Sequence, residues 1–331
     1  MTTSHKTKHR VGIDNYGLLP LGLSPQDVLR WASVHEAEGV AFSGLPPAQR
    51  EALDEAALRD LSQLAVSLGL YLEWGGAQHI PRDTTTWAHK ELAGINRRAA
   101  GEAATLGVRV VRSCSGGLMR WTSEAPDTEV LLAETASALR AQRHMLEDHG
   151  IVLAIETHFE FTSFELARLI ERCEAEPGGW LGICLDTMNL LTMIEDPVCA
   201  TKRLLPWIVA THIKDGGVLL TENGLTSFAA PIGNGTIALA DILALLDGLD
   251  TRVNLSVEDH GGAFDIPLFD PAFLSRFPDL TAKELALLIQ AAQRSAAKPE
   301  CRPLHRACWA EVAESRMHAN IQALRALAGH L

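Results

Sequence analysis

The sequence predicts a (β/α)8 barrel, the TIM barrel class, with additional helices after the last strand. Eight short runs of apolar and β-branched residues alternate with longer amphipathic segments, as strands alternate with helices in this class. No Pro/Gly/Ser-rich linker interrupts the alternation, and 331 residues with 47% hydrophobic content can bury one large core. A doubly wound open sheet is the alternative. No glycine-rich nucleotide-binding fingerprint favours it, and the glycine pair in residues 231–236 is typical of a loop.

The elements follow in order along the chain. Helix starts are marked by Ser24 before Pro25 and by two capping boxes, Thr162 with Glu165 and Thr281 with Glu284. The boxes predict helices after the fifth strand and beyond the last strand. The eight expected strands are residues 10–16, 39–44, 70–74, 108–114, 151–157, 181–187, 208–214 and 253–259.

The order of these elements divides the chain into three parts. Residues 1–9 are expected to form a flexible tail, and residues 10–268 the catalytic barrel. Residues 269–331 are expected to form a C-terminal helical extension packed on the barrel. Such an extension is also a plausible interface for a homo-oligomer.

The composition favours a small-molecule substrate. A formal net charge of -12 and a pI near 5.5 argue against binding to nucleic-acid phosphates or anionic lipids. No apolar run is long enough for a membrane helix, and the N-terminus does not resemble a signal peptide. We therefore expect a cytoplasmic protein without nucleic-acid or membrane partners. The six cysteines form no CxxC pair and are expected to be reduced and structural.

Ionisable residues end four consecutive strands. Active sites of (β/α)8 barrels lie at the carboxyl ends of the strands, so these side chains should meet at one mouth. Two glutamates, an aspartate and a histidine form an oxygen-rich set, which suits a hard divalent cation better than a structural zinc ion. The four predicted metal ligands are Glu156, Asp186, His212 and Glu258.

This succession, with Asp186 in "CLDTMN", His212 in "HIKD" and Glu258 in "VED", resembles the xylose isomerase-like TIM barrel superfamily, the sugar phosphate isomerase/epimerase group. The resemblance runs from about Val11 to Glu258. It implies one divalent metal ion on the four ligands. Mn²⁺ is favoured, and Mg²⁺, Co²⁺ and Zn²⁺ are the alternatives. It also implies that Glu156 and Glu258 are catalytic and move protons.

The implied activity is isomerisation or epimerisation of a small ketose or sugar derivative through a metal-stabilised enediolate. Asn189 departs from this pattern, because epimerase members commonly carry a histidine three residues after the sixth-strand aspartate. The cations Arg112 and Lys214 could hold a carboxylate. A metal-dependent lyase, a decarboxylase or dehydratase of a sugar-derived keto acid, is therefore the alternative. A non-enzymatic scaffold is a third reading, which the intact ligand set argues against.

Polar residues near the strand ends are candidates for contact with a carbohydrate or keto-acid substrate. An ion pair between Glu73 and Arg112 is the structural alternative for those two residues. Asp14 and Tyr16, at the end of the first strand, could also line the pocket. The predicted substrate-binding residues are Glu73, Arg112, His158, Asn189, Lys214 and His260.

Overall fold

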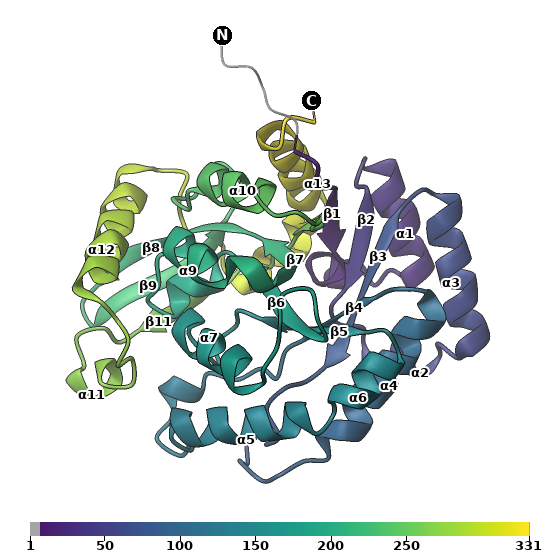
Figure 1. Ribbon diagram of the computed structural model, residues 1–331. Coiled ribbons are helices and arrows are strands. Elements are labelled where there is room, and N and C mark those ends of the chain that lie inside the picture. The colour runs from purple at the N-terminus through teal and green to yellow at the C-terminus, as the bar shows by residue number, and fades with distance from the viewer. Residues whose placement is uncertain (1–6, 331) are drawn as a thin grey trace.

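Eight parallel strands close into a barrel in the computed structural model, which describes residues 7–330 (Figure 1). Around the barrel the strands follow the order β1-β10-β7-β6-β5-β4-β3-β2. Each of the eight runs expected from the sequence supplies one of these strands, so the predicted fold class is confirmed. The strands are β1 (Val11–Asp14), β2 (Gly39–Phe42), β3 (Tyr71–Ala77), β4 (Val110–Ser113), β5 (Val152–Glu156), β6 (Leu181–Asp186), β7 (Ile208–Ile213) and β10 (Leu255–Val257).

Helices surround the barrel and connect its strands. They are α1 (Pro25–Val34), α2 (Pro47–Glu51), α3 (Glu55–Ser67), α4 (Leu92–Leu106), α5 (Thr128–Arg140), α6 (Arg143–Asp148), α7 (Ser163–Arg172), α8 (Asn189–Thr192), α9 (Pro197–Leu204), α10 (Leu239–Asp247), α11 (Pro271–Leu274), α12 (Ala282–Ala297) and α13 (Trp309–Leu327). Four 3-10 helices are also present, η1 (Asn15–Leu21), η2 (Met119–Trp121), η3 (Leu205–Trp207) and η4 (Arg306–Cys308). None of the helices within residues 7–330 combines the length and apolar character that crossing a bilayer requires.

Local sequence signals set the start of several helices. Thr162 and Glu165 form the predicted capping box at α7, with both reciprocal hydrogen bonds present. At α12, Thr281 accepts a hydrogen bond from the backbone of Glu284. The side chain of Glu284 departs from the predicted second box, because it instead accepts a hydrogen bond from Arg203 at 2.6 Å. An ion pair across the fold replaces the local contact.

Side chains alternate along each barrel strand between the interior and the surrounding helices. Leu153 and Ile155 of β5 belong to the large core between strands and helices. Inside the barrel, three small buried residues form a separate cluster, Ala154, Cys184 and Ala210. Two positions further along the same three strands stand Glu156, Asp186 and His212. The alternation therefore places these ionisable side chains in the layer above a floor of small residues.

Tyr71 of β3 is buried and needs space that two glycines supply. Its hydroxyl lies 2.9 Å from the hydroxyl of Ser256. A Cβ at Gly39 would stand 2.1 Å from the Tyr71 ring, and one at Gly12 would stand 2.3 Å from the Tyr71 hydroxyl. Any larger residue at these two positions would displace the ring.

A second, antiparallel sheet follows β7, and the sequence did not predict it. It contains β8 (Asp215–Thr221), β9 (Gly224–Ala230) and β11 (Ala263–Ile266), in the order β11-β9-β8. The two-residue turn at Glu222 and Asn223 joins β8 to β9. α12 packs on β8 (Figure 1). This helix of the C-terminal extension therefore covers the small sheet at β8.

The loop at residues 231–236 is held by one carboxylate. Asp215 accepts backbone hydrogen bonds from Gly216, Gly233 and Gly235 at 2.8 to 3.0 Å. Asp215 follows Lys214 at the end of β7, so this loop is fixed beside the barrel mouth, as expected for a barrel loop.

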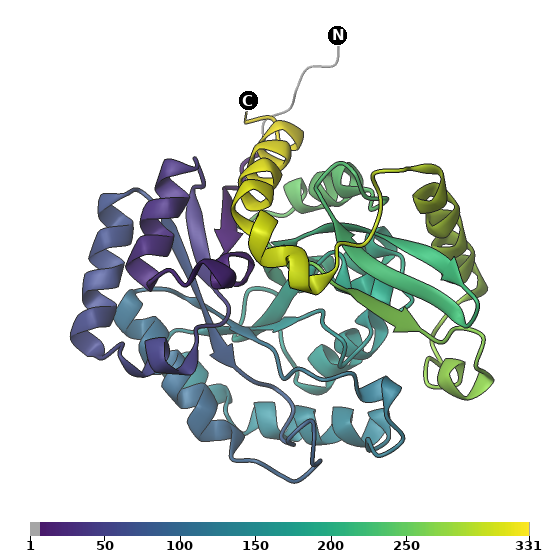
Figure 2. The same ribbon diagram turned by 180° about the vertical axis from the view of Figure 1, so that it is seen from behind.

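Both ends of the described chain meet at α13, which packs on β1 and η1 (Figures 1 and 2). The backbone N–H of Thr7 donates to the carbonyl of Ala328 at 3.0 Å, and the Thr7 hydroxyl donates to Asp247. His9 is buried. The Thr7 and His9 side chains are therefore packed against the fold, whereas a flexible tail was expected over residues 1–9. Residues 1–6 of that tail lie outside the described residues.

Candidate metal centre

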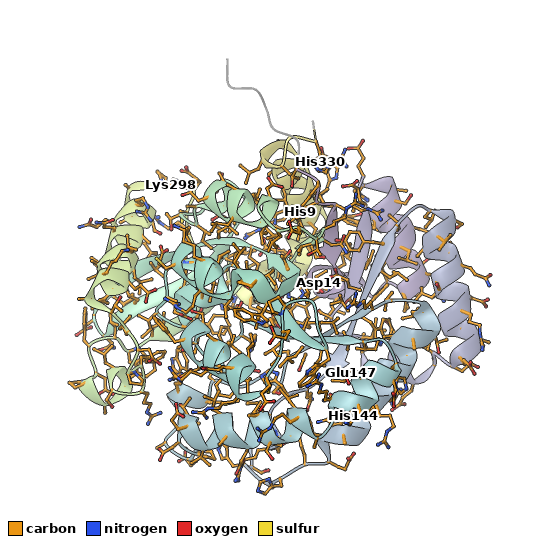
Figure 3. All side chains as sticks on the ribbon, viewed as in Figure 1. His9, Asp14, His144, Glu147, Lys298 and His330 are labelled. Atoms are coloured by element: carbon orange, nitrogen blue, oxygen red, sulfur yellow. The ribbon has the colours of Figure 1, made fainter. Side chains whose placement is uncertain are left out.

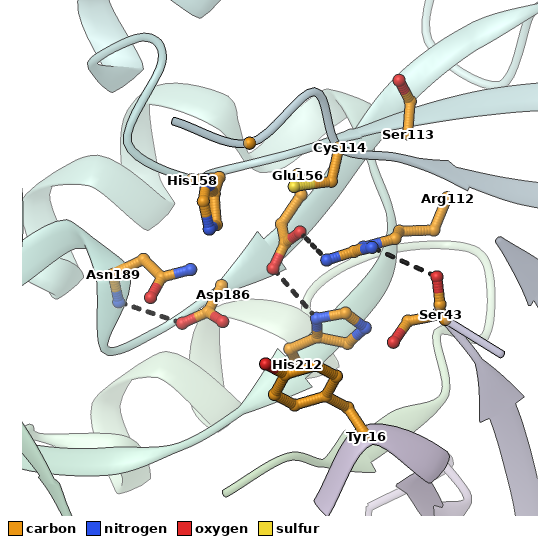
Figure 4. Close-up of polar contacts among 12 residues, drawn as sticks. Tyr16, Ser43, Arg112, Ser113, Cys114, Glu156, His158, Asp186, Asn189 and His212 are labelled. Carbon is orange, nitrogen blue, oxygen red and sulfur yellow. Dashed lines mark hydrogen bonds and ion pairs between the residues drawn. The ribbon is translucent and has the colours of Figure 1, made fainter. Parts of the chain in front are cut away.

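Four barrel strands deliver the predicted ligands to one point. Glu156 and Asp186 are the last residues of β5 and β6. His212 is the next-to-last residue of β7, and Glu258 directly follows β10. Figure 4 shows Glu156, Asp186 and His212 turned toward one another. Asp14, at the end of β1, lies near the centre of the barrel, whereas His144 and Glu147 of α6 lie on its outside (Figure 3).

The imidazole of His212 is surrounded by carboxylates. Its Nδ1 lies 3.1 Å from Glu156 Oε1 and 2.7 Å from Glu258 Oε2. Its Nε2 lies 3.4 Å from Asp14 Oδ2. Two carboxylates thus approach the same ring nitrogen, the arrangement expected around a shared cation or proton.

This donor set fits a divalent metal ion. One oxygen or nitrogen atom from each of the four buried residues lies within 4.8 Å of the other three. Asp186 Oδ2 and Glu258 Oε2 are buried and receive no well-aligned hydrogen bond within residues 7–330. Buried carboxylate oxygens normally have such a partner, and a hard cation would supply it. The geometry therefore supports the predicted ligand set.

Burial and neighbouring cations have opposite effects on the pKa values of the two glutamates. Burial alone would raise the pKa of Glu156, but Arg112 and His212 outweigh it and hold the pKa below its ordinary value. Burial is likewise outweighed at Glu258, where Lys214 and His212 hold the pKa well below its ordinary value. Both carboxylates are therefore ionised at neutral pH, the state that a metal ligand or a general base requires.

Asp186 and Lys214 form the other half of the centre. Lys214 Nζ lies 2.8 Å from Asp186 Oδ2 and 2.9 Å from Glu258 Oε1. The backbone N–H groups of Met188 and Asn189 each donate to Asp186 Oδ1 at 2.9 Å. Burial, partly offset by Lys214, raises the pKa of Asp186. Asp186 Oδ1 is thus oriented by the start of α8, and Oδ2 faces Lys214.

A cavity of about 410 Å³ opens above the centre. Its size suits a small sugar-like molecule. Contact of any lining residue with substrate stays a prediction. Among the residues singled out in the sequence, the lining includes Tyr16, Arg112, Glu156, His158, Asn189, Lys214, Glu258 and His260.

Glu73 does not belong to this lining. Its buried carboxylate accepts a hydrogen bond from Asn254 at 2.8 Å, and burial raises its pKa to about 7. Arg112 donates to Glu156 instead of pairing with Glu73. The structure therefore corrects the expected ion pair with Arg112. The Glu73 side chain lies in the barrel interior with Tyr71, two positions earlier on β3, and its contact with substrate stays a prediction.

A second group of polar residues stands beside the cavity. Cys114, His158 and Glu160 also have potential ligand atoms within 4.8 Å of one another. Both Glu160 oxygens are already used. One accepts from the backbone of Ser115 and Gly116 at 2.9 and 2.6 Å, and the other lies 2.9 Å from His158 Nδ1. Glu160 thus orients His158. The sequence analysis missed it, although its spacing of two from His158 was a usable signal.

The sequence itself decides the family. The sequence profile of the xylose isomerase-like TIM barrel family matches residues 29–290. The chain belongs to this family. The match covers all four candidate ligands of this xylose isomerase-like TIM barrel, and it ends before α13.

Two curated proteins are similar to this xylose isomerase-like TIM barrel in sequence. The uncharacterized protein YihM of Escherichia coli K12 is 26% identical over 191 residues, 58% of this chain and 56% of that protein. The 3-oxo-isoapionate decarboxylase of Pectobacterium atrosepticum is 26% identical over 214 residues, 63% of this chain and 68% of that enzyme. The chain thus matches little more than half the length of YihM.

Solved structures share the fold at lower identity. An L-ribulose 3-epimerase has a TM-score of 0.57 and 19% identity, over 93% of this chain and 96% of that one. A xylose isomerase-like TIM barrel protein from Mycobacterium smegmatis, in complex with magnesium, has a TM-score of 0.58 and 15% identity, over 88% of this chain and all of that one. At these identities the likeness extends to the fold alone.

Proposed function

We propose that this chain is a divalent-metal-dependent enzyme that acts at the carbon next to a carbonyl group in a small sugar or sugar-derived acid. One observation carries the proposal. Two ionised glutamates, Glu156 and Glu258, converge on one nitrogen of His212 beneath a cavity of about 410 Å³. In a bound complex, Glu156, Asp186, His212 and Glu258 would hold the metal ion. The metal would polarise the carbonyl of the substrate.

The side chains around the centre have different roles in the proposed reaction. Glu156 and Glu258 are the acid-base pair, because both line the cavity and their pKa values are lowered below the ordinary value. Asn189 lines the same cavity and offers an amide that can hydrogen-bond a substrate oxygen but cannot exchange a proton as a histidine can. An ion pair with the partly exposed Arg112 fixes the buried Glu156 carboxylate.

Decarboxylation of a sugar-derived keto acid is the reaction type we favour. Loss of CO₂ breaks one carbon–carbon bond, and its electron pair passes onto the polarised carbonyl oxygen. The carbon that lost CO₂ then takes a proton that comes from water, and Glu156 or Glu258, ionised at rest, would relay it. The decarboxylase relative supports this choice, because it is 26% identical over 63% of this chain. Asn189, in place of a second acid-base histidine, agrees with it.

Isomerisation or epimerisation of a small ketose is the second candidate. Here one glutamate would remove a proton from carbon, and the other would return it to the opposite face. The presence of two carboxylates at the same centre favours this reaction. Both reactions need the same metal and the same glutamates, so the substrate decides between them.

The test incubates Mn²⁺-loaded protein in D₂O with a panel of ketoses and 3-oxo sugar acids, followed by NMR. Release of CO₂ with one deuterium in the product supports decarboxylation. Deuterium incorporation with the carbon count unchanged supports the epimerase. Absence of both from the whole panel would refute the proposal.

Two variants test the roles of the glutamates. Glu156→Gln and Glu258→Gln should each abolish the reaction, since each removes a carboxylate that moves a proton, while circular dichroism stays unchanged. Glu51→Gln, on an exposed position of α2, is the matched control and should react normally. Full activity of either first variant would remove that residue from the acid-base pair.

A further inference from the structure

The C-terminal extension contributes one wall of the cavity above the metal centre. The carbonyl of Leu304 accepts a hydrogen bond from Gly262 N–H at 2.7 Å, next to the loop that carries Glu258. The buried indole of Trp309 donates to the carbonyl of Gly17 at 3.1 Å. These contacts fix η4 at the barrel mouth, where the C-terminal segment crosses the barrel in Figure 2. The segment lies outside residues 29–290, the part that matches the family.

η4 brings Arg306 into the cavity. The guanidinium of Arg306 donates to the hydroxyl of Tyr16 at 2.8 Å, and both side chains line the cavity. The Tyr16 ring packs edge-on against His260, with ring centroids 5.4 Å apart. The hydrogen bond to Tyr16 thus holds the Arg306 side chain at the wall of the cavity.

Arg306 differs from the other permanent cations of the cavity in its partners. Arg112 is paired with Glu156, and Lys214 is paired with Asp186 and Glu258. Within residues 7–330, Arg306 forms no ion pair, and its one side-chain hydrogen bond goes to the neutral Tyr16 hydroxyl. Its planar set of donors is therefore free for an incoming oxyanion, and a carboxylate matches that geometry in a bidentate manner.

We infer that Arg306, supported by Tyr16, binds a carboxylate of the substrate in the cavity above the metal centre. Arg306 is then a specificity-determining residue that selects acids over neutral sugars. This inference rests on the proposed function, because it assumes that the cavity receives the substrate. It requires no particular reaction at the metal centre.

The test measures binding rather than turnover, so it can fail independently of the proposed function. Mn²⁺-loaded protein is titrated by calorimetry with erythronate and with erythritol, which differ by one carboxylate. The wild type should prefer erythronate. Arg306→Gln should weaken erythronate binding roughly tenfold to a hundredfold, because a charge-assisted contact is lost. It should change erythritol binding by less than about twofold.

Three further variants sharpen the result. Arg306→Lys should retain part of the preference, since the charge remains but the bidentate geometry does not. Tyr16→Phe should weaken erythronate binding less than Arg306→Gln does. Arg59→Gln, at an exposed position on α3, should behave like the wild type.

Several outcomes would overturn the inference. The first is an equal affinity of the wild type for erythronate and erythritol. The second is an equal loss of affinity for both ligands in Arg306→Gln. The third is an unchanged affinity of Arg306→Gln for erythronate, which would mean that the metal alone holds the acid. Erythritol 4-phosphate is the comparison ligand. If Arg306→Gln weakens the phosphate but not erythronate, the site selects phosphate esters and the carboxylate assignment is wrong.

Discussion

Replacing Glu73 by glutamine should stabilise the protein at alkaline pH. Burial, partly offset by the hydrogen bond from Asn254, raises the pKa of Glu73 from 4.5 to about 7. Below pH 4.5 the carboxyl is protonated in the folded and unfolded chain, so ionisation costs nothing. Above pH 7 it is ionised in both. At about 1.4 kcal/mol per pKa unit, the buried charge then lowers the free energy of unfolding by about 3 kcal/mol.

Glu73→Gln removes this charge and keeps an oxygen that can accept from Asn254. Urea unfolding of the metal-free protein, followed by circular dichroism at pH 5 and pH 8, measures the effect. The variant should gain about 2 to 3 kcal/mol over the wild type between these two pH values. Glu51→Gln on the surface of α2 should gain nothing. If Glu73→Gln gains equally at both pH values, or loses stability at pH 8, the charge of Glu73 is not the cause and the reasoning fails.

Three further predictions concern metal binding and packing. Asp186→Asn should weaken Mn²⁺ binding by more than about tenfold in calorimetry, because even changes around metal ligands cost about that much; unchanged affinity would exclude it as a ligand. Gly39→Ala should cost about 1 to 3 kcal/mol of unfolding free energy, since its Cβ would stand 2.1 Å from the neighbouring tyrosine ring, whereas Gly44→Ala, with no atom within 4 Å, should not. Arg120→Met should cost about 3 to 5 kcal/mol by leaving the buried Glu165 without its cation, and the double variant with Glu165→Leu should recover much of that loss.

The barrel could be predicted because its signals are local. Each buried strand is a short apolar run, and an ionisable residue that ends such a run must lie at the barrel mouth. Glu156 and Asp186 could therefore be placed from the sequence. The small sheet could not, since β11 pairs with β9 from more than 30 positions away and its sequence is short and half-exposed. Only the turn at residues 222–223 gave a local signal.

The partners of the site residues were harder to predict than their positions. Strand alternation places Glu73 and Arg112 inside the barrel, but barrel tilt and register decide that Arg112 reaches Glu156 and that Glu73 meets Asn254. No feature of the sequence indicated that Arg306 lines the cavity. It reaches the cavity because the C-terminal segment folds back over the mouth, and nothing in the residues around it encodes that path.

The hydrogen bond between Thr7 and Ala328 holds the two ends of the described chain side by side. The order of the elements along the chain could therefore be changed without moving them in space. A circular permutant could join these two neighbouring ends by a short linker and begin at Asn223, in the exposed turn between β8 and β9. Glu258 and Arg306 would then be synthesised before Glu156, with every barrel strand still in place. Retained Mn²⁺ binding by such a permutant would show that the centre depends on the closed barrel and not on the order in which its ligands leave the ribosome.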